Sequence, residues 1–280
     1  MSDVHVRGVR YEVDRPLLAD IDLVLRAGEM TALSGPSGSG KTTLLSIVGG
    51  LLEPTAGEAT YDGASTWRGT GDPRPEVAFV LQVYGLVPIL SARENVSVAL
   101  RARGVDPVAA DEQAVAALTR FHIADLADRQ VEELSGGQMQ RVALARGLCV
   151  GAGVLLADEP TSELDEGNRA LVLAELRREA ERGAVVVVAT HDPAVVDACD
   201  AHHALDDGRL VDHTEPVHLP GHPEPAPEPG PPSRHPSPAP EPAPEPAPEH
   251  QHEPEQHRPE QHQPPAPVDH SAFRRPPAGR

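Results

Sequence analysis

Residues 35–43 read GPSGSGKTT and match the phosphate-binding loop pattern G-x-x-x-x-G-K-[ST]. Glycines suit such a loop because backbone N–H groups must approach a triphosphate closely, and a Cβ atom would block them. In this pattern Lys41 reaches the β- and γ-phosphates, and the hydroxyl of Thr42 is a ligand of Mg²⁺. The flanking residues predict a strand over 28–35, GEMTALSG, and a helix over 42–50, TTLLSIVGG. The residues predicted to contact the nucleotide here are Gly35, Pro36, Ser37, Gly38, Ser39, Gly40, Lys41, Thr42 and Thr43.

The composition changes sharply near residue 214. Residues 214–280 hold 22 of the 31 prolines and 8 of the 14 histidines, in runs such as EPAPEPAPEH. Such a composition cannot bury a core, so we predict one folded domain over residues 1–213 and a disordered, proline-rich tail over residues 214–280. The tail histidines lack the fixed spacing of a metal site, which favours a plain solvated tail.

Charge and cysteine content exclude several classes of protein. Of the net charge of −19, the tail carries −5, which leaves −14 on residues 1–213. A domain this acidic lacks the basic footprint of nucleic-acid binding, so no nucleic-acid partner is expected. Two cysteines are too few for a disulfide framework and indicate a reducing compartment. No apolar run approaches the roughly 18 residues of a membrane span, and residues 1–13 lack a secretion signal, so a cytoplasmic chain is expected.

The alternation of residues 4–25 predicts antiparallel strands ahead of the loop. After a phase shift at Gly8, the side chains of Val9, Tyr11 and Val13 share one face. An aromatic ring at Tyr11 could stack on an adenine. On spacing alone, a tyrosine on the exposed face of an edge strand explains the residue equally well.

Residues 83–134 form a second, helical region. Within it, residues 109–121, AADEQAVAALTRF, place Val115, Leu118 and Phe121 on one face with charges opposite. We therefore predict a helical insertion between the strand that ends before Gln82 and the motif that follows Leu134.

That motif is LSGGQMQRVALAR, residues 134–146. Ser135 followed by Gln138 is a capping-box pattern, and an ordinary capped helix is the simplest interpretation. However, two glycines in the first turn cost about 1 kcal/mol each relative to alanine. This cost indicates that something approaches the backbone closely, and a phosphate at the helix N-terminus would explain it.

Polar residues follow three predicted strands. GVLLADEP, residues 153–160, predicts a buried parallel strand that ends in Asp158 and Glu159. Ligands of open α/β sheets lie beyond the carboxyl ends of the strands, so Asp158 suits a Mg²⁺ site and Glu159 a general base for water. The next strand, AVVVVATHD, ends before His191, and the strand–helix–strand order predicts that His191 lies beside Glu159, where a γ-phosphate could be contacted. Gln82 is either a loop residue or a contact for Mg²⁺ or the attacking water.

The set GPSGSGKTT, Gln82, LSGGQ, LLADEP, SELD and His191 occurs in one order over residues 1–213. This set resembles the ATP-binding subunit of ABC transporters. The stretches GGLLEPTAG and LQVYGLVPILSARENV are most similar to the lipoprotein-release and macrolide-export group. Two departures stand out: Leu81 where that group more often has an aromatic residue, and Ser162-Glu163 in place of its usual Gly-Asn.

The resemblance implies an α/β fold, with a P-loop NTPase (RecA-like) core, an antiparallel β subdomain and a helical insertion. It also implies a head-to-tail homodimer, in which ATP lies between the phosphate-binding loop of one subunit and Ser135, Gly136, Gly137 and Gln138 of the other. By motif position, Tyr11 stacks on adenine and Asp165 reports across the dimer interface. The implied catalytic residues are Lys41, Gln82, Glu159 and His191. The implied Mg²⁺ ligands are Thr42, Gln82 and Asp158.

The resemblance further implies a motor that hydrolyses ATP to move a separate integral membrane permease, in export, lipoprotein release or mechanotransmission. The chain would then be peripheral on the inner face of the cell membrane. An apolar loop follows Gln82 and is the predicted permease contact, with packing beneath the helical insertion as the alternative. The loop contains Tyr84, Leu86, Val87, Pro88, Ile89 and Leu90.

Two of three rival functions are disfavoured by the sequence. A soluble ABC-type ATPase with a non-membrane partner is the alternative that remains. A GTPase reads guanine with an N-K-x-D motif, which requires a second lysine, and Lys41 is the only lysine in the chain. A pure binding module does not explain why both Glu159 and His191 are present.

Overall fold

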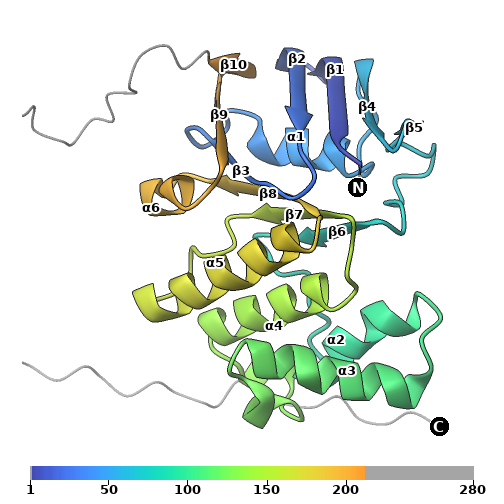
Figure 1. Cartoon of the computed structure of the whole chain (residues 1–280), viewed down its shortest axis with the longest axis vertical. Helices are drawn as coiled ribbons and strands as arrows, with labels where there is room; N and C mark the ends of the chain where they lie inside the picture. Colours follow the sequence, from blue (N-terminus) through green and yellow to red (C-terminus); the bar gives the residue numbers. More distant parts are fainter. Residues whose placement is uncertain (1, 212–280) are drawn as a thin grey trace, which may run out of the picture. The chain divides into compact units, whose positions relative to one another are not determined.

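Six strands form the central sheet of the computed structural model, which describes residues 2–211 (Figure 1). The strand order is β10-β9-β3-β8-β7-β6, and every neighbouring pair is parallel except β9 with β10. The strands are β3 (Met30–Ser34), β6 (Val77–Val80), β7 (Val154–Asp158), β8 (Val185–Thr190), β9 (Ala201–Asp206) and β10 (Arg209–Val211). Strands β7 and β8 are buried along their whole length, as their unbroken apolar runs predict for parallel strands covered on both faces. The predicted tail, residues 214–280, lies outside the described residues, and the domain boundary at residue 213 stays a prediction.

A second sheet, with the order β2-β1-β4-β5, forms the predicted antiparallel subdomain. Its strands are β1 (Val4–Glu12), β2 (Pro16–Leu25), β4 (Ala56–Tyr61) and β5 (Ala64–Ser65). The β1–β2 register shifts between Val6 and Val9, where the sequence predicted a phase shift at Gly8. The prediction for Val13 was wrong: this residue lies in the turn beyond β1 and is 66% exposed, because the strand ends at Glu12.

The helices cover both faces of the central sheet. They are α1 (Lys41–Val48), α4 (Gly136–Leu148), α5 (Glu166–Glu181) and α6 (Pro193–Asp197). Helix α1 lies between the two sheets, where Leu44 and Leu45 join one buried cluster with the apolar residues of β1 and β2. Helices α4 and α5 cover the opposite face and share a second cluster with β7 and β8. The phosphate-binding loop therefore connects β3 to a helix whose apolar residues are buried in the first cluster.

The helical insertion packs on the side of α4 that faces away from the sheet (Figure 1). It contains α2 (Ala92–Arg101), α3 (Pro107–Arg120) and two short 3-10 helices, η1 (Ala124–Leu126) and η2 (Val131–Glu133). Leu118 and Phe121 are fully buried, as predicted. Val115 is 38% exposed, contrary to prediction, because α3 turns its alanines, Ala114 and Ala117, toward the core instead. Within residues 2–211, no helix combines the length and apolar character needed to cross a membrane.

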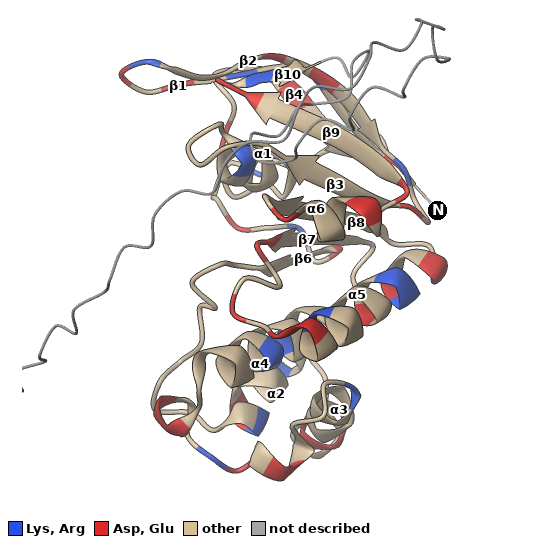
Figure 2. Cartoon of the chain, turned by 90° about the vertical axis from the view of Figure 1, so that its left-hand side faces the viewer, with Lys and Arg blue, Asp and Glu red and all other residues tan. Residues whose placement is uncertain are grey.

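An ionic cluster joins the insertion to α5. The guanidinium of Arg120, at the end of α3, donates to Glu175 Oε2 at 2.6 Å and to Glu179 Oε1 at 2.9 Å. Both carboxylates are buried and also pair with arginines one turn along α5, Arg178 and Arg182. The alternation of basic and acidic segments along α5 is visible in Figure 2. Because removal of one partner from a buried ion pair leaves an uncompensated charge, this cluster fixes α3 against α5.

Candidate active site

The phosphate-binding loop connects β3 to α1 and depends on its glycines. Gly35, Gly38 and Gly40 have φ angles of +145°, +81° and +107°, which side chains rarely adopt. A Cβ atom on Gly35 would lie 2.0 Å from the carbonyl oxygen of Leu205, and one on Gly40 would lie 3.0 Å from that of Leu17. The glycines therefore serve the packing of the loop against its own chain as well as ligand approach. Helix α1 begins at Lys41, one residue earlier than predicted.

The loop presents polar groups suited to a phosphate. The Nζ atom of Lys41 donates to the carbonyl oxygens of Gly35 and Pro36, at 2.7 and 3.0 Å. Ser39 is buried, and its Oγ is one of two buried side-chain polar atoms in residues 2–211 without a hydrogen-bond partner. An unpaired buried hydroxyl costs about 1–3 kcal/mol, which an added acceptor oxygen would recover. Pro36, Ser37 and Gly38 are exposed, so a ligand can reach the loop.

Thr42 and Asp158 meet at the end of β7. The Thr42 hydroxyl donates to Asp158 Oδ2 at 2.6 Å, and Asp158 is buried. Hydroxyl and carboxylate oxygens are ligands that Mg²⁺ prefers, so this donor set fits that ion. Gln82 lies exposed beyond the end of β6. Since β6 pairs in parallel with β7, Gln82 beyond the end of β6 and Asp158 at the end of β7 lie toward the same edge of the sheet.

Glu159 and His191 are brought into contact, as the strand order predicted. The Nδ1 atom of His191 lies 2.7 Å from Glu159 Oε1, and the hydroxyl of Thr190 lies 3.5 Å from Glu159 Oε2. Glu159 is buried, whereas the His191 ring is largely exposed at the mouth of the site. Glu159 also has a φ of +49°, an uncommon value for a residue with a side chain. This arrangement holds a carboxylate at the sheet edge with one oxygen paired to a solvent-facing imidazole.

The glycine-containing motif begins α4 with the predicted capping box. The Ser135 side chain accepts from the backbone N–H of Gln138, whose side chain accepts from the backbone N–H of Ser135. A Cβ atom on Gly137 would lie 3.0 Å from the carbonyl oxygen of Glu163. One on Gly136 would lie 3.4 Å from the Glu163 carboxylate. A side chain at position 137 would therefore crowd the backbone before α5, independently of any phosphate, whereas one at position 136 would make an ordinary contact.

Asp165 and Tyr11 lie at the margins of this site. Asp165 is the N-cap of α5, and its pKa is lowered because its carboxylate accepts from the backbone N–H and the side chain of Asn168. Tyr11 is half-buried on β1 opposite Leu18, whose side chain adjoins Gly40 of the phosphate-binding loop. Tyr11 therefore lies on a strand pair that adjoins the loop, and the stacking of its ring on adenine stays a prediction.

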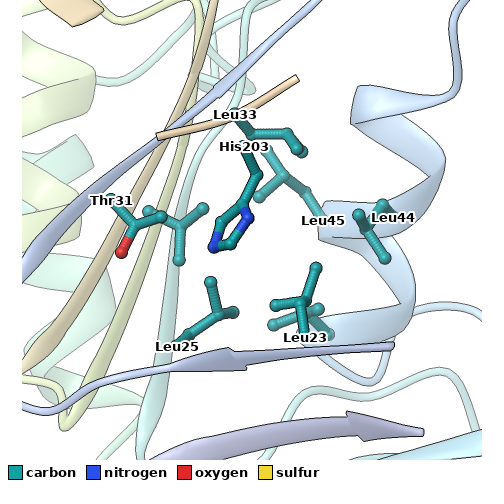
Figure 3. A pocket seen from close by; sticks show the side chains of 9 residues that line it. Leu23, Leu25, Thr31, Leu33, Leu44, Leu45 and His203 are labelled. Atoms are coloured by element: carbon teal, nitrogen blue, oxygen red, sulfur yellow. The ribbon is translucent and has the colours of Figure 1, made fainter. Parts of the chain in front are cut away.

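The two cysteines and the cavity beside α1 do not offer an alternative active site. Burial raises the pKa of the Cys149 thiol to about 12 and that of Cys199 to about 11, so neither is a ready nucleophile. A small apolar cavity lies beside α1, where the His203 ring points among Leu23, Leu25 and Leu45 (Figure 3). Its volume is about 10 Å³, which is room for one water molecule and not for a nucleotide.

The sequence interpretation missed two polar residues that brace the loop after Gln82. Asn95 on α2 is fully buried and bonds the backbone of Val87, Leu90 and Ser91, and Arg146 on α4 donates to the carbonyls of Tyr84 and Gly85. Together they hold the loop that follows Gln82.

Gln140 on α4 was missed as well. It bonds the backbone of Glu159 and Glu163. The sequence does indicate that Gln140 is buried, because it lies three and four residues before the buried Ala143 and Leu144 on the same face of the helix. Ser162, one of the two departures from the resembled group, donates its hydroxyl to the Glu159 carbonyl at 3.2 Å.

Comparisons with known proteins agree with this geometry. The family model described as "ABC transporter" matches residues 18–162. The macrolide export ATP-binding/permease protein MacB of Salmonella typhimurium is 39% identical over 208 residues, and that of Syntrophobacter fumaroxidans is 41% identical over 192 residues. These matches cover 72% and 66% of this chain and only 32% and 27% of the two relatives. The chain thus spans about a third of the length of the curated relatives it matches.

Solved structures give a similar result. A dimeric post-hydrolysis state of the ATP-binding cassette MJ0796, bound to ADP and Pi, is 31% identical with a TM-score of 0.67. A second dimeric structure of MJ0796, described as a bacterial ABC transporter cassette, is 30% identical with a TM-score of 0.68. Each alignment covers 74% of this chain and 96% of that chain.

Proposed function

This chain belongs to the ABC transporter family and is an ATPase of that family, and from this premise we propose that it is the motor subunit of a transporter. ATP binding and hydrolysis in a head-to-tail homodimer would drive a separate membrane permease. The observation that carries the proposal is the meeting of Thr42 with Asp158 and of Glu159 with His191 at one edge of the central sheet. A binding loop and a carboxylate base are thereby placed side by side.

The phosphate-binding loop would hold the triphosphate. Lys41 would exchange its two backbone carbonyl partners for the β- and γ-phosphate oxygens, a stronger, charge-assisted contact. The unpaired Ser39 hydroxyl would donate to a phosphate oxygen. The N-terminus of α1 would add its backbone N–H groups and positive dipole end. Tyr11 would stack on the adenine ring.

Thr42, Asp158 and Gln82 would hold Mg²⁺ through their oxygen atoms. When bound, the ion would neutralise charge on the phosphates. In the described structure the Thr42 hydroxyl and the Asp158 carboxylate are already oriented toward each other, so little reorganisation of these side chains is needed.

Glu159 would be the general base of hydrolysis. Its carboxylate would accept the proton of the attacking water while His191, on the exposed side, contacts the γ-phosphate. The 2.7 Å contact between the two side chains orients the carboxylate, and its burial limits the number of alternative positions. A positioned base contributes roughly 10²–10⁴-fold to such a rate.

The dimer would complete each nucleotide site. Ser135, Gly136, Gly137 and Gln138 would face the ATP held by the partner subunit, with Asp165 close to the interface. Exposure of Ser135 at the N-terminus of α4 supports this role, as do the dimeric cassettes named above.

A membrane permease is the proposed partner. The curated relatives are named as combined ATP-binding/permease proteins, and this chain matches only the cassette-sized third of them. A chain of this type would lie on the inner face of the membrane and serve export, lipoprotein release or mechanotransmission. The exposed apolar residues after β6, Val83, Val87 and Ile89, supply a surface for that contact.

The variant Glu159→Gln tests the proposal, because it keeps the side-chain size and removes the base. We expect the rate of ATP hydrolysis to fall by about 10²-fold or more. ATP should still bind, and the dimer should accumulate because it is no longer dissolved by hydrolysis, which size-exclusion chromatography with and without ATP measures. Mixing with Ser135→Arg chains should reduce the dimer, since the mixed pair lacks one complete site. Hydrolysis at the parent rate, or a monomer at saturating ATP, would contradict the proposal.

A further inference from the structure

Gln140 connects α4 to the turn that carries Glu159. Its side chain is 2% exposed. The Nε2 atom donates to the carbonyl oxygen of Glu159 at 3.0 Å, and the Oε1 atom accepts from the backbone N–H of Glu163 at 3.1 Å. One amide therefore spans the turn of residues 159–163 from its first residue to its last.

The turn it spans is unfavourable for an ordinary residue. Glu159 has a φ of +49°, in the left-handed region, which costs a residue with a Cβ atom roughly 1–2 kcal/mol. The next residue is Pro160, which has no N–H to donate. Such a conformation persists only where surrounding contacts hold it.

Three donors converge on the Glu159 carbonyl. Ser162 contributes its backbone N–H at 3.3 Å and its hydroxyl at 3.2 Å, both from within the turn. Gln140 contributes the remaining one, from a different element. Because the local donors move with the turn, it is Gln140 that supplies the hydrogen bonds between the turn and α4.

An amide is the side chain that fits this task. It donates with nitrogen and accepts with oxygen, and both functions are used. A carboxylate would place a second acceptor against the Glu159 carbonyl. A methionine of similar length would leave the Glu163 N–H without that partner in a buried place.

We propose that Gln140 is a positioning residue for hydrolysis: by holding the 159–163 turn against α4, it sets where the Glu159 carboxylate lies. This rests on the proposed function, in which Glu159 is the base. Gln140 would not touch ATP, and its effect on the reaction would pass through Glu159 alone. The same two bonds join the helix that begins at Ser135 to the base of the same subunit.

Steady-state kinetics of Gln140→Met and Gln140→Glu are the first test. We expect kcat to fall by about 10-fold or more while KM for ATP stays within about twofold, since small misplacements of a catalytic group cost rate and the phosphate-binding loop is untouched. The control is Gln113→Glu, the same chemical change on the exposed face of α3. A Gln140→Met chain with the parent kcat would overturn the proposal.

A double-mutant cycle separates positioning from general damage. In the Glu159→Gln background, Gln140→Met should change the residual rate by less than about twofold, because the group it positions is already gone. Equal losses in both backgrounds would show that Gln140 acts elsewhere. If Gln140→Met fails to fold, Gln140→Asn, which keeps the amide and shortens the side chain by one methylene, carries the same cycle and should lower kcat at constant KM.

Hydrogen exchange provides a readout that does not depend on turnover. Backbone amides of residues 159–165 should exchange faster in Gln140→Met than in the parent chain, with exchange in β3 and α1 unchanged. Unchanged exchange across the turn would overturn the inference even in an active enzyme. A parent chain without ATPase activity would overturn the proposed function instead, and faster exchange in the variant would still show that Gln140 holds the turn.

Discussion

At the scale of single residues, the site concentrates unfavourable conformations where chemistry is expected. Gly35 and Gly40 occupy backbone angles that a side chain would not tolerate, and Glu159 adopts such an angle despite having one. Each is held by packing from outside its own turn: Leu205 against the loop and Gln140 against Glu159. Strain of this kind is typical of sites that fix reacting groups in advance.

Lys41 gives a prediction at this scale. Replacing it with alanine should weaken ATP binding by about 10-fold or more, because a charge-assisted bond to phosphate contributes about 1.5–3 kcal/mol. Equilibrium titration with ATP measures this. Lys41→Arg should not restore affinity, since the planar guanidinium does not fit a place shaped for a compact ammonium. Affinity equal to that of the parent in Lys41→Ala would rule out the phosphate-binding role of the loop.

At the scale of elements, polar contacts decide how the helical insertion is attached. Arg120 joins α3 to α5 through two buried glutamates, and Asp111 joins α3 to α2. The Asp111 carboxylate accepts from the Ser97 hydroxyl at 2.6 Å and from Arg101 at 2.8 Å. The hydrogen bond from Ser97, together with the nearby arginines, holds the pKa of Asp111 below its ordinary value of 3.8.

The lowered pKa makes Asp111→Asn a pH-dependent change. A carboxyl group with a depressed folded-state pKa contributes stability above its unfolded pKa and loses it as the pH falls through the folded pKa. Asp111→Asn should therefore reduce the free energy of unfolding by about 1 kcal/mol at pH 7, with the difference shrinking below about pH 4. Urea unfolding at several pH values checks this, with Asp14→Asn in the exposed β1–β2 turn as the control. A difference that stays constant from pH 7 to pH 3 would contradict the assignment.

At the scale of the whole molecule, the described chain has two buried clusters, one on each face of the central sheet, and the site at one sheet edge between them. The loop after β6 runs from this edge toward the insertion. Its apolar residues divide in two: Leu86 packs against the core and Tyr84 is half-buried near Gly136, whereas Val83 and Ile89 are 81% and 76% exposed. The exposed half is the part able to contact another protein.

A prediction about the partner follows from that division. Val83→Ser combined with Ile89→Ser should abolish co-purification with the cognate permease and leave basal ATP hydrolysis near the parent value, because both side chains point to solvent. Val108→Ser, on an exposed position of α3, is the matched control. A double variant that binds the permease as well as the parent does would place the contact surface elsewhere.

The sequence by itself determined the elements and the spacing of the site. The loop of residues 35–43, the capping box at Ser135 and the acids at the end of β7 are set by neighbours within a few residues, so periodicity, turn residues and strand order suffice to predict them. Even the contact between Glu159 and His191 followed from the order of strands.

Only the tertiary structure decided which side chains are covered. Val115 and Val13 are apolar in pattern yet exposed, and Gln140 and Glu175 are polar yet buried. Whether such a position is covered depends on an element distant in sequence: Arg120 at the end of α3 covers the carboxylate of Glu175 on α5, and the 159–163 turn covers Gln140. A local sequence pattern shows which face of its helix or strand a side chain lies on. Whether that face is buried depends on which other element packs against it.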